Sequence, residues 1–428
     1  MINLILILIG KLLTKIIQIF NLGNGSTWPG HIALGFNKNF IHEIILRSGL
    51  KIIVIAGTNG KTTTAKLIQT VLEENGKQVF QNQSGANLRN GIASTIILNT
   101  NFAGQLRDDY AIFEIDENAL PQILKELTPD YLVLLNLFRD QLDRYGEVDS
   151  VAHKWNESLR HLAKKTRLIL NADDPQIAFL GTDSKEAIYF GLNIKAAEDK
   201  EAELEHAADS IYCPKCGSKL SYSSIYYSHL GKWDCKKCGL RPPEENLFSK
   251  FSFYPLKGTY NSYNTLAAVV VLKQIGLSDS SIEMGLNKFK PAFGRQEVII
   301  YNHKRIQLFL SKNPTGFNES LKTIKQSGAK IVLLVLNDNI ADGRDVSWIW
   351  DIDFVKFDTL LVAGERAYDM GLRIKYQDQN LNFKVYENLR LAIEEGVGNI
   401  KSDETLYILP TYTAMLAVRK ILTGKGIL

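Results

Sequence analysis

The sequence has few cysteines, and all four of them lie within residues 213–238. Since no cysteine remains elsewhere to form a bridge, a secreted protein held together by disulfides is not expected. The chain also lacks long blocks of like charge, internal repeats and low-complexity tracts, which argues against a solenoid and against a largely disordered protein. Its 50 basic and 46 acidic residues leave a formal charge of +4, so the composition does not indicate a nucleic-acid partner.

The sequence lacks an apolar run long enough to cross a membrane. The first twenty residues, "MINLILILIGKLLTKIIQIF", contain Lys11 and Lys15, and a lysine at the bilayer centre is costly. No small-residue cleavage site follows, so a secretory signal is not expected. The apolar residues that recur at helical spacing are Ile5, Ile9, Leu12, Ile16 and Phe20. They predict an amphipathic helix that either packs on the protein body or lies on a membrane surface.

The length of 428 residues is too great for one hydrophobic core and indicates two or three domains. Apolar runs alternate with helical stretches, a pattern typical of α/β domains with mostly parallel sheets. Strands are predicted at 51–57, 77–82, 109–116 and 130–137, and another begins at residue 167. A second series of strands is predicted at 330–336, 359–364, 383–388 and 405–412. The predicted domains are an N-terminal amphipathic helix and linker (1–47), a central domain with an insertion at about 205–245 (48–298), and a C-terminal Rossmann-like α/β domain (299–428).

The cysteines form two short pairs, Cys213 with Cys216 and Cys235 with Cys238, with eighteen residues between the pairs. Four thiolates at this spacing can close a tetrahedral Zn²⁺ site. A glycine directly follows each pair, where a tight knuckle needs backbone freedom. Because four protein thiolates leave no open position on the metal, the predicted zinc is structural.

The stretch "VIAGTNGKTTTAKLI", residues 54–68, joins a predicted buried strand to a helix through a glycine-rich turn. The N–H groups of such a turn and of the helix N-terminus form an anion site, whereas an ordinary connection is the alternative. The Lys61 ammonium can neutralise phosphates and the Thr62 hydroxyl can bind Mg²⁺. Ile55 replaces the first glycine of the strict P-loop pattern, so the match is to a shorter loop. The residues predicted to bind nucleotide are Gly57, Thr58, Asn59, Gly60, Lys61, Thr62 and Thr63.

Acidic residues follow two of the predicted strands. Glu114 and Asp116 end the strand "DYAIFEID", and Asp140 and Asp143 follow the next one. If the strands are parallel, these ends lie at the same edge of the sheet as the glycine-rich turn. A carboxylate there can hold Mg²⁺ directly or through water. We therefore predict Glu114 as a metal ligand, with a solvated strand end as the alternative.

Six ordered motifs between residues 48 and 300 make the chain resemble the Mur ligase family. They are "GTNGKTTT", "FEIDE", "LNLFRDQLDRYGEVD", "LNADDP", "GTYNSYNTLAA" and "FGRQE". Members of that family couple ATP cleavage to amide-bond formation through an acyl phosphate. The resemblance implies a Mur ligase-type central domain that binds ATP and Mg²⁺. It also implies that Glu114 is a metal ligand, that Asn264 lies against the nucleotide and that Arg295 contacts phosphate.

Departures from the family pattern narrow this expectation. Too few residues precede the first predicted strand for the domain that grips a UDP-linked precursor, and Gln141 replaces the histidine of the family's Asp-His-Leu-Asp motif. The chain resembles one branch of the family, in which the ligase is the synthetase subunit of an amidotransferase. The features that carry this resemblance are the cysteine-containing insertion at about 205–245, which we call the zinc ribbon, and the stretches "SKNPTGFNESL" and "LNDNIADGRDVSWIWDIDF". That branch implies cytoplasmic amidation of the D-glutamate α-carboxyl group of lipid II, with ammonia from a GatD-like class I glutaminase subunit. The N-terminal helix is then a candidate contact with the inner face of the plasma membrane.

Residues 336–351 carry four aspartates: Asp338, Asp342, Asp345 and Asp351. On turn chemistry alone, an aspartate here caps a turn. In the resembled branch, an acid of this segment completes the catalytic Cys–His pair of the glutaminase partner, and the motif position assigns this role to Asp345. An aspartate that accepts a hydrogen bond from a histidine fixes its tautomer. Glu319 and Asp351 are the nearest alternatives.

Three other functions are considered. A regulatory P-loop NTPase could bind nucleic acid through the ribbon. The lysines available for that are Lys215, Lys219, Lys232, Lys236 and Lys237. Such a switch does not need the strand-end acids of the last domain, so we expect no nucleic-acid partner. A folylpolyglutamate-type ligase shares the phosphate loop but does not explain the ribbon. An amidase that uses free ammonia alone is the third.

Overall fold

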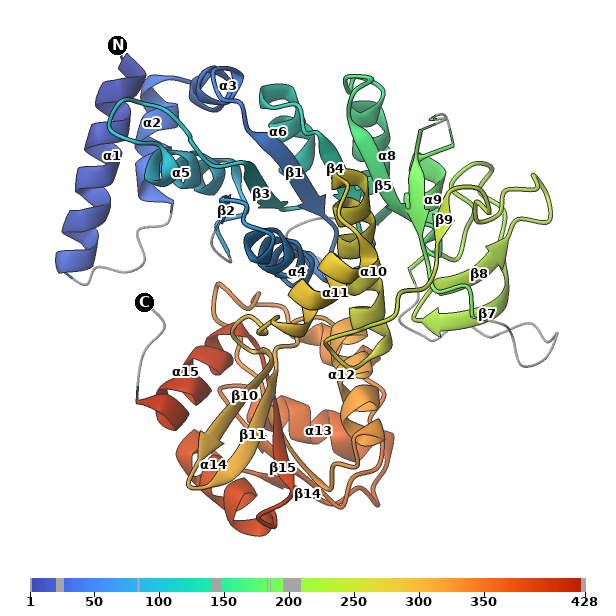
Figure 1. Cartoon of the computed structure of the whole chain (residues 1–428). Coiled ribbons are helices and arrows are strands. Elements are labelled where there is room, and N and C mark those ends of the chain that lie inside the picture. Colours follow the sequence, from blue (N-terminus) through green and yellow to red (C-terminus); the bar gives the residue numbers. More distant parts are fainter. Residues whose placement is uncertain are drawn as a thin grey trace.

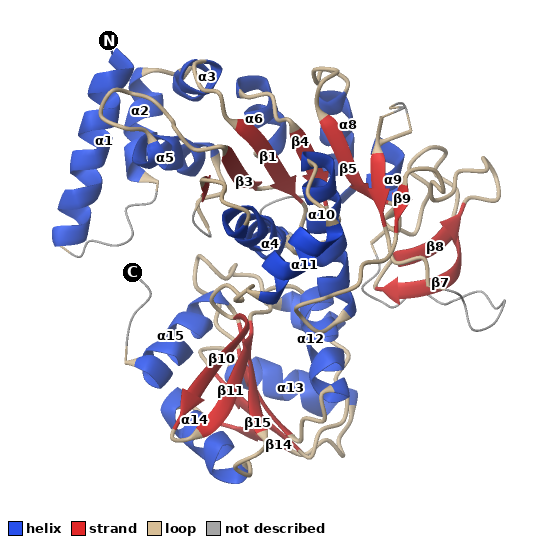
Figure 2. Cartoon of the chain, viewed as in Figure 1, coloured by secondary structure: helices blue, strands red, loops and turns tan. Residues whose placement is uncertain are grey.

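The computed structural model describes residues 2–20, 27–82, 85–139, 148–182, 184, 186–194 and 209–424. Two α/β units, each built around its own sheet, lie one above the other with α10 and α12 close to their junction (Figures 1 and 2). The α/β class expected from the alternating pattern is confirmed. Within the described residues, no helix combines the length and the hydropathy that a membrane crossing requires.

The first sheet has seven strands, all parallel, in the order β2-β3-β1-β4-β5-β6-β9. Their bounds are β1 Lys51–Ala56, β2 Val79–Gln81, β3 Tyr110–Ile115, β4 Tyr131–Leu134, β5 Arg167–Asn171, β6 Ile188–Phe190 and β9 Leu247–Phe248. Alternate residues of β1 enter two different cores: Ile52 and Val54 point to one face, Ile53 and Ile55 to the other. Burial on both faces explains why the strand reads as an uninterrupted apolar run.

Helices cover both faces of this sheet. On one face lie α4 Lys61–Glu74, α10 Thr259–Ile275 and α11 Asp279–Asn287. On the other lie α5 Arg89–Asn99, α6 Leu120–Glu126, α8 Val148–Leu159 and α9 Pro175–Leu180. Because every strand runs in the same direction, the carboxyl ends of β1, β3 and β4 meet at one edge, which is where sites form in open α/β sheets.

The second sheet has six strands in the order β10-β11-β15-β12-β13-β14. Their bounds are β10 Arg295–Tyr301, β11 Lys304–Phe309, β12 Ile331–Val335, β13 Thr359–Ala363, β14 Phe383–Val385 and β15 Thr405–Pro410. The antiparallel hairpin β10–β11 is absent from the sequence-based prediction. The expected boundary near residue 298 therefore falls inside β10. One face carries α12 Pro314–Gln326, the 3-10 helix η1 Ser347–Asp351 and α13 Ala367–Gln377; the other carries α14 Leu389–Asn399 and α15 Tyr412–Thr423.

The N-terminal segment corrects one expectation. Part of the predicted linker is helical, as α2 Trp28–Phe36 and α3 Phe40–Leu46. The physical reason is burial: Phe40 and Ile41 lie wholly inside the core of the first domain. The predicted helix α1, Ile2–Ile19, packs on α2 and α5 (Figure 1).

The cysteine-containing insertion forms a small unit with a two-stranded sheet, β7 Ser221–Tyr227 and β8 Leu230–Asp234. It docks on the turn that follows β5. The Trp233 indole donates to the Ala172 carbonyl (3.2 Å), and the Gly231 N–H donates to the Asp173 carbonyl (3.0 Å). The acidic stretch 195–208 and the expected start of the insertion at 205 lie outside the described residues.

The contact between α2 and α5 gives a prediction about stability. A Cβ atom at Gly30 would lie 1.9 Å from the Asn90 carbonyl oxygen, whereas a Cβ atom at Gly35, in the same helix, would meet nothing within 4 Å. We expect Gly30→Ala to lower the free energy of unfolding by about 3 kcal/mol or more, because two helix backbones must separate. Gly35→Ala should raise it by about 0.5–1 kcal/mol, since alanine loses less backbone entropy. Denaturant titration measures both, and an unchanged Gly30→Ala protein would contradict the packing.

Candidate nucleotide site

The site begins with the turn between β1 and α4, residues Gly57 to Gly60. Gly57 has φ +140° and Gly60 has φ +95°, conformations that favour glycine. Space also excludes a side chain, because a Cβ atom at Gly60 would lie 2.0 Å from the Asn264 Oδ1 atom. The turn leads directly into the first residue of α4, Lys61. Its backbone N–H groups and the helix N-terminus are therefore arranged as the predicted anion site requires.

The end of β4 holds this turn in place. The Asn136 side chain accepts a hydrogen bond from the Asn59 N–H (2.8 Å) and donates one to the Asn59 carbonyl (3.1 Å). The Thr58 hydroxyl accepts from the Phe138 N–H (3.0 Å) and donates to the Phe138 carbonyl (3.1 Å). Both faces of the turn are thus tied to the neighbouring strand end, so its shape exists before any ligand arrives.

The Lys61 side chain folds back over the turn. Its ammonium donates to the Gly57 carbonyl (2.5 Å) and lies 3.4 Å from the Glu117 carboxylate. Both Lys61 and Glu117 are largely buried. The ammonium is therefore already positioned at the anion site, and Glu117 is a partner that the sequence does not reveal.

Thr62 and Glu114 lie together at the same edge. The Thr62 hydroxyl donates to the Glu114 Oε2 atom (2.8 Å), while the Oε1 atom is buried and has no hydrogen-bond partner among the residues that the structure describes. The Asn82 amide holds the Glu114 backbone on both sides, through its N–H (2.8 Å) and its carbonyl (2.9 Å). Burial raises the pKa of Glu114, and the hydrogen bond from Thr62 and the charges of Arg295 and Lys61 oppose this rise.

This pair of oxygen donors fits a small divalent cation. Mg²⁺ binds one or two protein oxygens and fills its other positions with water and phosphate oxygens. A buried carboxylate oxygen without a partner is costly to the fold, and a cation beside it would satisfy it. The alternative of a solvated strand end at Glu114 does not hold, since this residue is 4% exposed. Asp116 instead accepts a hydrogen bond from the Asn118 N–H (3.0 Å) before α6.

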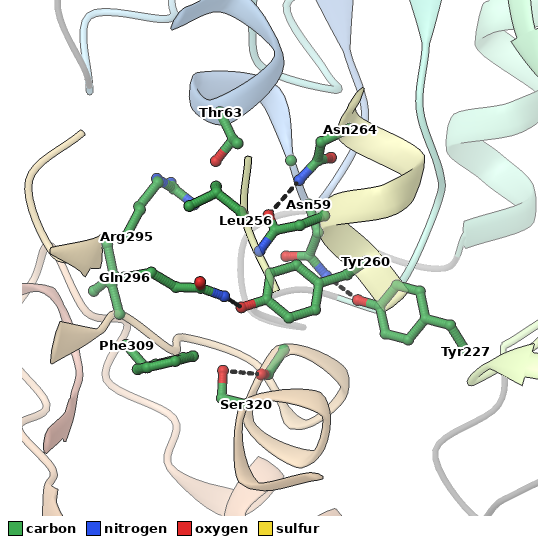
Figure 3. A pocket seen from close by; sticks show the side chains of 14 residues that line it. Asn59, Thr63, Tyr227, Leu256, Tyr260, Asn264, Arg295, Gln296, Phe309 and Ser320 are labelled. Carbon is green, nitrogen blue, oxygen red and sulfur yellow. Dashed lines mark hydrogen bonds between the residues drawn. The ribbon is translucent and has the colours of Figure 1, made fainter. Parts of the chain in front are cut away.

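A pocket lies above the turn, between the two domains (Figure 3). Five of the predicted residues line it: Asn59, Gly60, Thr63, Asn264 and Arg295. Its other walls include residues that were not predicted, among them Tyr227, Tyr260, Gln296, Phe309 and Ser320. The two domains and the ribbon each contribute, which is the common position of a nucleotide pocket in a multidomain protein.

A β-bulge explains how the C-terminal sheet contributes two neighbouring residues. The register between β10 and β11 shifts between Arg295 and Glu297, and the residue between them, Gln296, has φ +60°. A bulge breaks the strict alternation of strand side chains, so Arg295 and Gln296 both reach the pocket. The Gln296 amide donates to the Tyr260 hydroxyl (2.9 Å) and to the Lys257 carbonyl (2.8 Å).

One hydrogen bond joins the C-terminal domain to the phosphate turn itself. The Asn313 Nδ2 atom donates to the Asn59 Oδ1 atom (3.1 Å), while its Oδ1 atom caps α12 by accepting from the Gly316 N–H (2.8 Å). Asn313 belongs to the "SKNPTG" stretch, the only sequence signal for this contact. The position of the second domain is therefore coupled to the turn that would carry the phosphates.

The four cysteines converge at one end of the ribbon. Their sulfur atoms all lie within 4.8 Å of one another, with Cys213 and Cys238 3.6 Å apart and Cys216 and Cys235 3.5 Å apart. The glycine after each pair has φ near +70° (71° and 72°), as the knuckle geometry requires. The convergence fits a tetrahedral metal site of four thiolates.

The other end of the ribbon reaches the nucleotide pocket. Tyr227 lines the pocket, and its ring lies 5.2 Å from the ring of Phe138, whose backbone holds Thr58. The His229 ring lies 4.7 Å from the ring of Phe138, tilted by 53°, and its Nε2 atom lies 3.4 Å from the Asp174 carboxylate. The ribbon thus supports the wall next to the phosphate turn.

The aspartate-rich segment lies in the C-terminal domain. Asp342 is buried and holds the start of α15 by accepting from the Thr413 N–H (2.8 Å), and Asp338 pairs with Arg366 (3.5 Å). Asp345 is only half-buried and accepts from the N–H (2.8 Å) and hydroxyl (2.9 Å) of Ser347. Asp345 is therefore a turn cap in the isolated chain. Asp140 and Asp143 lie outside the described residues.

Comparison with known proteins agrees with this architecture. Residues 55–272 match the family described as the Mur ligase middle domain, and residues 310–415 match the family described as MurT ligase C-terminal. The chain is 36% identical over 372 residues to the MurT subunit of the glutamine-hydrolysing lipid II isoglutaminyl synthase of Staphylococcus aureus strain COL, covering 82% of this chain and 83% of the relative. It is 34% identical over 432 residues to the corresponding subunit of Streptococcus pneumoniae strain R6, covering 95% and 94%.

Solved structures show the same fold at lower identity. A pseudomurein peptide ligase type C from Methanothermus fervidus superposes with a TM-score of 0.65 at 22% identity, covering 89% of this chain and 80% of the other. The MurF ligase of Thermotoga maritima, solved with ADP, gives a TM-score of 0.60 at 14% identity, with coverage of 91% and 83%. The matched middle domain, the matched C-terminal domain and the identity to MurT subunits over most of their length together establish that the chain belongs to the MurT branch of the Mur ligase family.

Proposed function

We propose that this chain is the synthetase subunit of an enzyme that amidates the D-glutamate α-carboxyl group of the lipid II stem peptide to D-isoglutamine. As a member of this family it is an ATP-dependent ligase. The observation that carries the proposal is the meeting of Lys61, Thr62 and Glu114 at one sheet edge, below a pocket closed by the second domain. The names of the MurT relatives support lipid II as the substrate.

Each group of the site has a task in activating the carboxylate. The N–H groups of the turn and α4 bind the β- and γ-phosphates, and the Lys61 ammonium neutralises the charge that develops during transfer. Arg295 contacts phosphate from the opposite side, and Asn264 lies against the nucleotide. Thr62 and Glu114 would hold Mg²⁺, which would act as a Lewis acid toward the phosphates.

The reaction needs this activation because a carboxylate does not react with ammonia directly. In the proposed sequence, a carboxylate oxygen of the substrate attacks the γ-phosphorus, the bond to the β-phosphate oxygen breaks, and ADP leaves. Ammonia then attacks the acyl carbon of the acyl phosphate, loses a proton, and inorganic phosphate leaves. The site supplies positioning and electrostatic stabilisation, the two contributions that dominate phosphoryl transfer.

We place the ammonia source on a GatD-like class I glutaminase that docks on the C-terminal domain. Exposed apolar and aromatic side chains surround the segment of Asp345: Ile340 is 71% exposed, and Trp350 and Tyr376 form an exposed edge-to-face pair at 5.7 Å. Such residues are common at protein interfaces. Asp345 would exchange its bond to Ser347 for a histidine of the partner. The enzyme would work on the cytoplasmic side of the membrane, where ATP is available.

We further propose that the four cysteines bind one structural Zn²⁺. The sulfur distances and the two positive-φ glycines support this assignment. Because the ribbon carries Tyr227 and packs on Phe138, the metal would also stabilise the wall of the nucleotide pocket. It takes no part in the chemistry, since four thiolates leave no site for substrate.

The first prediction from the proposed function concerns Lys61. We expect Lys61→Ala to reduce ATP-dependent amidation by on the order of 10²-fold or more, because a preorganised positive charge is lost from the transferring phosphate. Lys66→Ala is the matched control: Lys66 lies in the same helix, its ammonium donates to the Gln69 side chain (3.1 Å), and the variant's activity should stay near the parental value. Turnover of lipid II with ammonium as nitrogen source measures both. Near-parental turnover by Lys61→Ala would remove the turn from the mechanism.

The second prediction separates the two subunits. Asp345→Asn should abolish glutamine hydrolysis by the reconstituted pair, since the partner's histidine would lose the acceptor that sets its tautomer and charge. Excess ammonium should restore amidation, because the phosphate site lies in the other domain. Asp351→Asn, in the same segment, should leave glutamine hydrolysis unchanged. Parental glutaminase activity in the Asp345→Asn complex would show that Asp345 is only a turn cap.

The third prediction concerns the ribbon. Protein purified without chelator should contain one zinc per chain, and Cys216→Ser should lose it. Because Tyr227 and Phe138 would shift, the affinity for a non-hydrolysable ATP analogue should fall by roughly tenfold, about 1.4 kcal/mol. Lys237→Ala, an exposed change in the second knuckle, should alter neither quantity. Metal analysis and titration calorimetry decide the question, and a zinc-free parental protein would refute the assignment.

A further inference from the structure

The outward face of α1 is the largest feature that the proposed catalytic function does not use. Eight large aliphatic side chains of this one helix are exposed to solvent: Ile2, Leu4, Ile5, Leu8, Ile9, Leu12, Ile16 and Ile19. Leu12 is 61% and Ile19 is 78% exposed. Scattered apolar residues are normal on a protein surface, but a continuous apolar face of this kind indicates an interaction surface.

The inner face of α1 combines apolar and polar side chains. Leu6 and Ile7 are buried in the core of the central domain. Two buried polar residues of this face are hydrogen-bonded: Asn3 donates to Glu43 (2.7 Å), and Thr14 donates to the Gly10 carbonyl (3.0 Å). Gly10 allows close approach, because a Cβ atom there would lie 3.2 Å from Pro29 and 2.8 Å from Ile97. The sequence stripe that predicts amphipathicity, including Ile5, Ile9, Leu12 and Ile16, is therefore the outward face.

This face is held in a fixed orientation. Lys11 donates to the Leu98 carbonyl at the end of α5 (3.0 Å), and its ammonium lies 5.7 Å over the ring of Phe102. Phe102 is 73% exposed and extends the apolar surface beyond the helix. In Figure 1, α1 forms the edge of the molecule, with α2 and α5 on its inner side. The helix is thus anchored to the rigid central domain.

The charges of α1 indicate what covers this face. The helix contains no acidic residue, and Lys15 is exposed on one flank of the apolar face, about one turn after Lys11, whose ammonium is held at the Leu98 carbonyl. An apolar face bordered by an exposed lysine and free of acids complements an anionic lipid surface, with aliphatic groups among the acyl chains and the Lys15 ammonium at the phosphates. A helix that lies in the interface also agrees with the finding that no described helix can span a membrane.

We propose that the outward face of α1 binds the anionic cytoplasmic surface of the membrane, so that the central domain is held against the lipid layer. This proposal rests on the proposed function in one respect: membrane binding would bring the nucleotide site close to a lipid-linked carboxylate. Membrane binding itself requires no turnover and depends on no residue of the nucleotide site.

The test is flotation of the full chain with vesicles of phosphatidylcholine containing one-third phosphatidylglycerol. We expect the parental chain to float with the vesicles. The triple variant Ile5→Gln, Leu12→Gln, Ile16→Gln should bind at least tenfold more weakly, because the buried aliphatic area is lost. Since these side chains are exposed and glutamine is a good helix former, circular dichroism and binding of an ATP analogue should be unchanged.

A matched triple variant removes exposed apolar groups elsewhere. It combines Met284→Gln on α11, Ile300→Gln on β10 and Leu391→Gln on α14. This variant should float like the parental chain. Lys15→Gln should weaken binding to the anionic vesicles by about fivefold and leave binding to pure phosphatidylcholine unchanged, the effect of one lysine near an anionic surface. The Lys61→Ala protein should float normally, which separates a failure of the catalytic assignment from a failure of this one.

Two results would overturn the proposal. In the first, the parental chain stays in the aqueous fraction with both vesicle compositions. In the second, the parental chain does not float and light scattering shows that it is a dimer, whereas the α1 triple variant is a monomer. That result would assign the face to a second copy of the chain.

Discussion

The turn between β1 and α4 is the constraint on which the rest of the site depends. Neither Gly57 nor Gly60 can carry a side chain without collision, and β1 lies in the middle of the sheet, between β3 and β4. The turn can therefore present its N–H groups only at the carboxyl edge of the strands. Asn136, just after β4, reaches the turn, and Glu114 of β3 reaches Thr62 at the start of α4, because both strands run parallel to β1. The remainder of the protein supplies groups to that edge.

A local cost accompanies this arrangement. Within the described part of the chain, Glu114 is buried with one oxygen unpartnered, and the Lys61 ammonium contacts the Gly57 carbonyl and Glu117. Unsatisfied buried polar atoms destabilise a fold, and they persist where function needs them. In this protein Lys61, Glu114 and Glu117 are largely buried, so binding of phosphate and cation would improve the electrostatics of the folded chain. This fits catalysis by preorganised charge.

The pocket also depends on elements that are distant in the sequence. Asn313 connects the second domain to the phosphate turn, and Gln296, at a β-bulge, connects it to α10 through Tyr260. The ribbon adds Tyr227 and packs on Phe138. A change in the second domain or in the cysteine-containing ribbon would therefore affect the nucleotide pocket through identifiable contacts. On the opposite side of the central domain, α1 presents its apolar face outward, away from this machinery.

The sequence by itself determined the elements whose signals are local. Buried parallel strands read as apolar runs, the phosphate turn follows from glycines before Lys61 and Thr62, and the cysteine spacing predicts the convergence of four thiols. Motif resemblance added the family, together with Asn264 and Arg295, which no local signal places at the pocket. These predictions succeed because hydrophobic periodicity, turn conformation and ligand spacing act over a few residues.

Only the tertiary structure decided the rest. The hairpin β10–β11, the helices in place of the predicted linker, and the contacts of Glu117 and Asn313 all depend on partners far along the chain. The outward stripe of α1 is the clearest case. Periodicity identifies an amphipathic helix, but it cannot tell which face the body covers. That choice followed from the close approach that Gly10 permits and from the partner that Asn3 finds in Glu43, and both exist only in the folded protein.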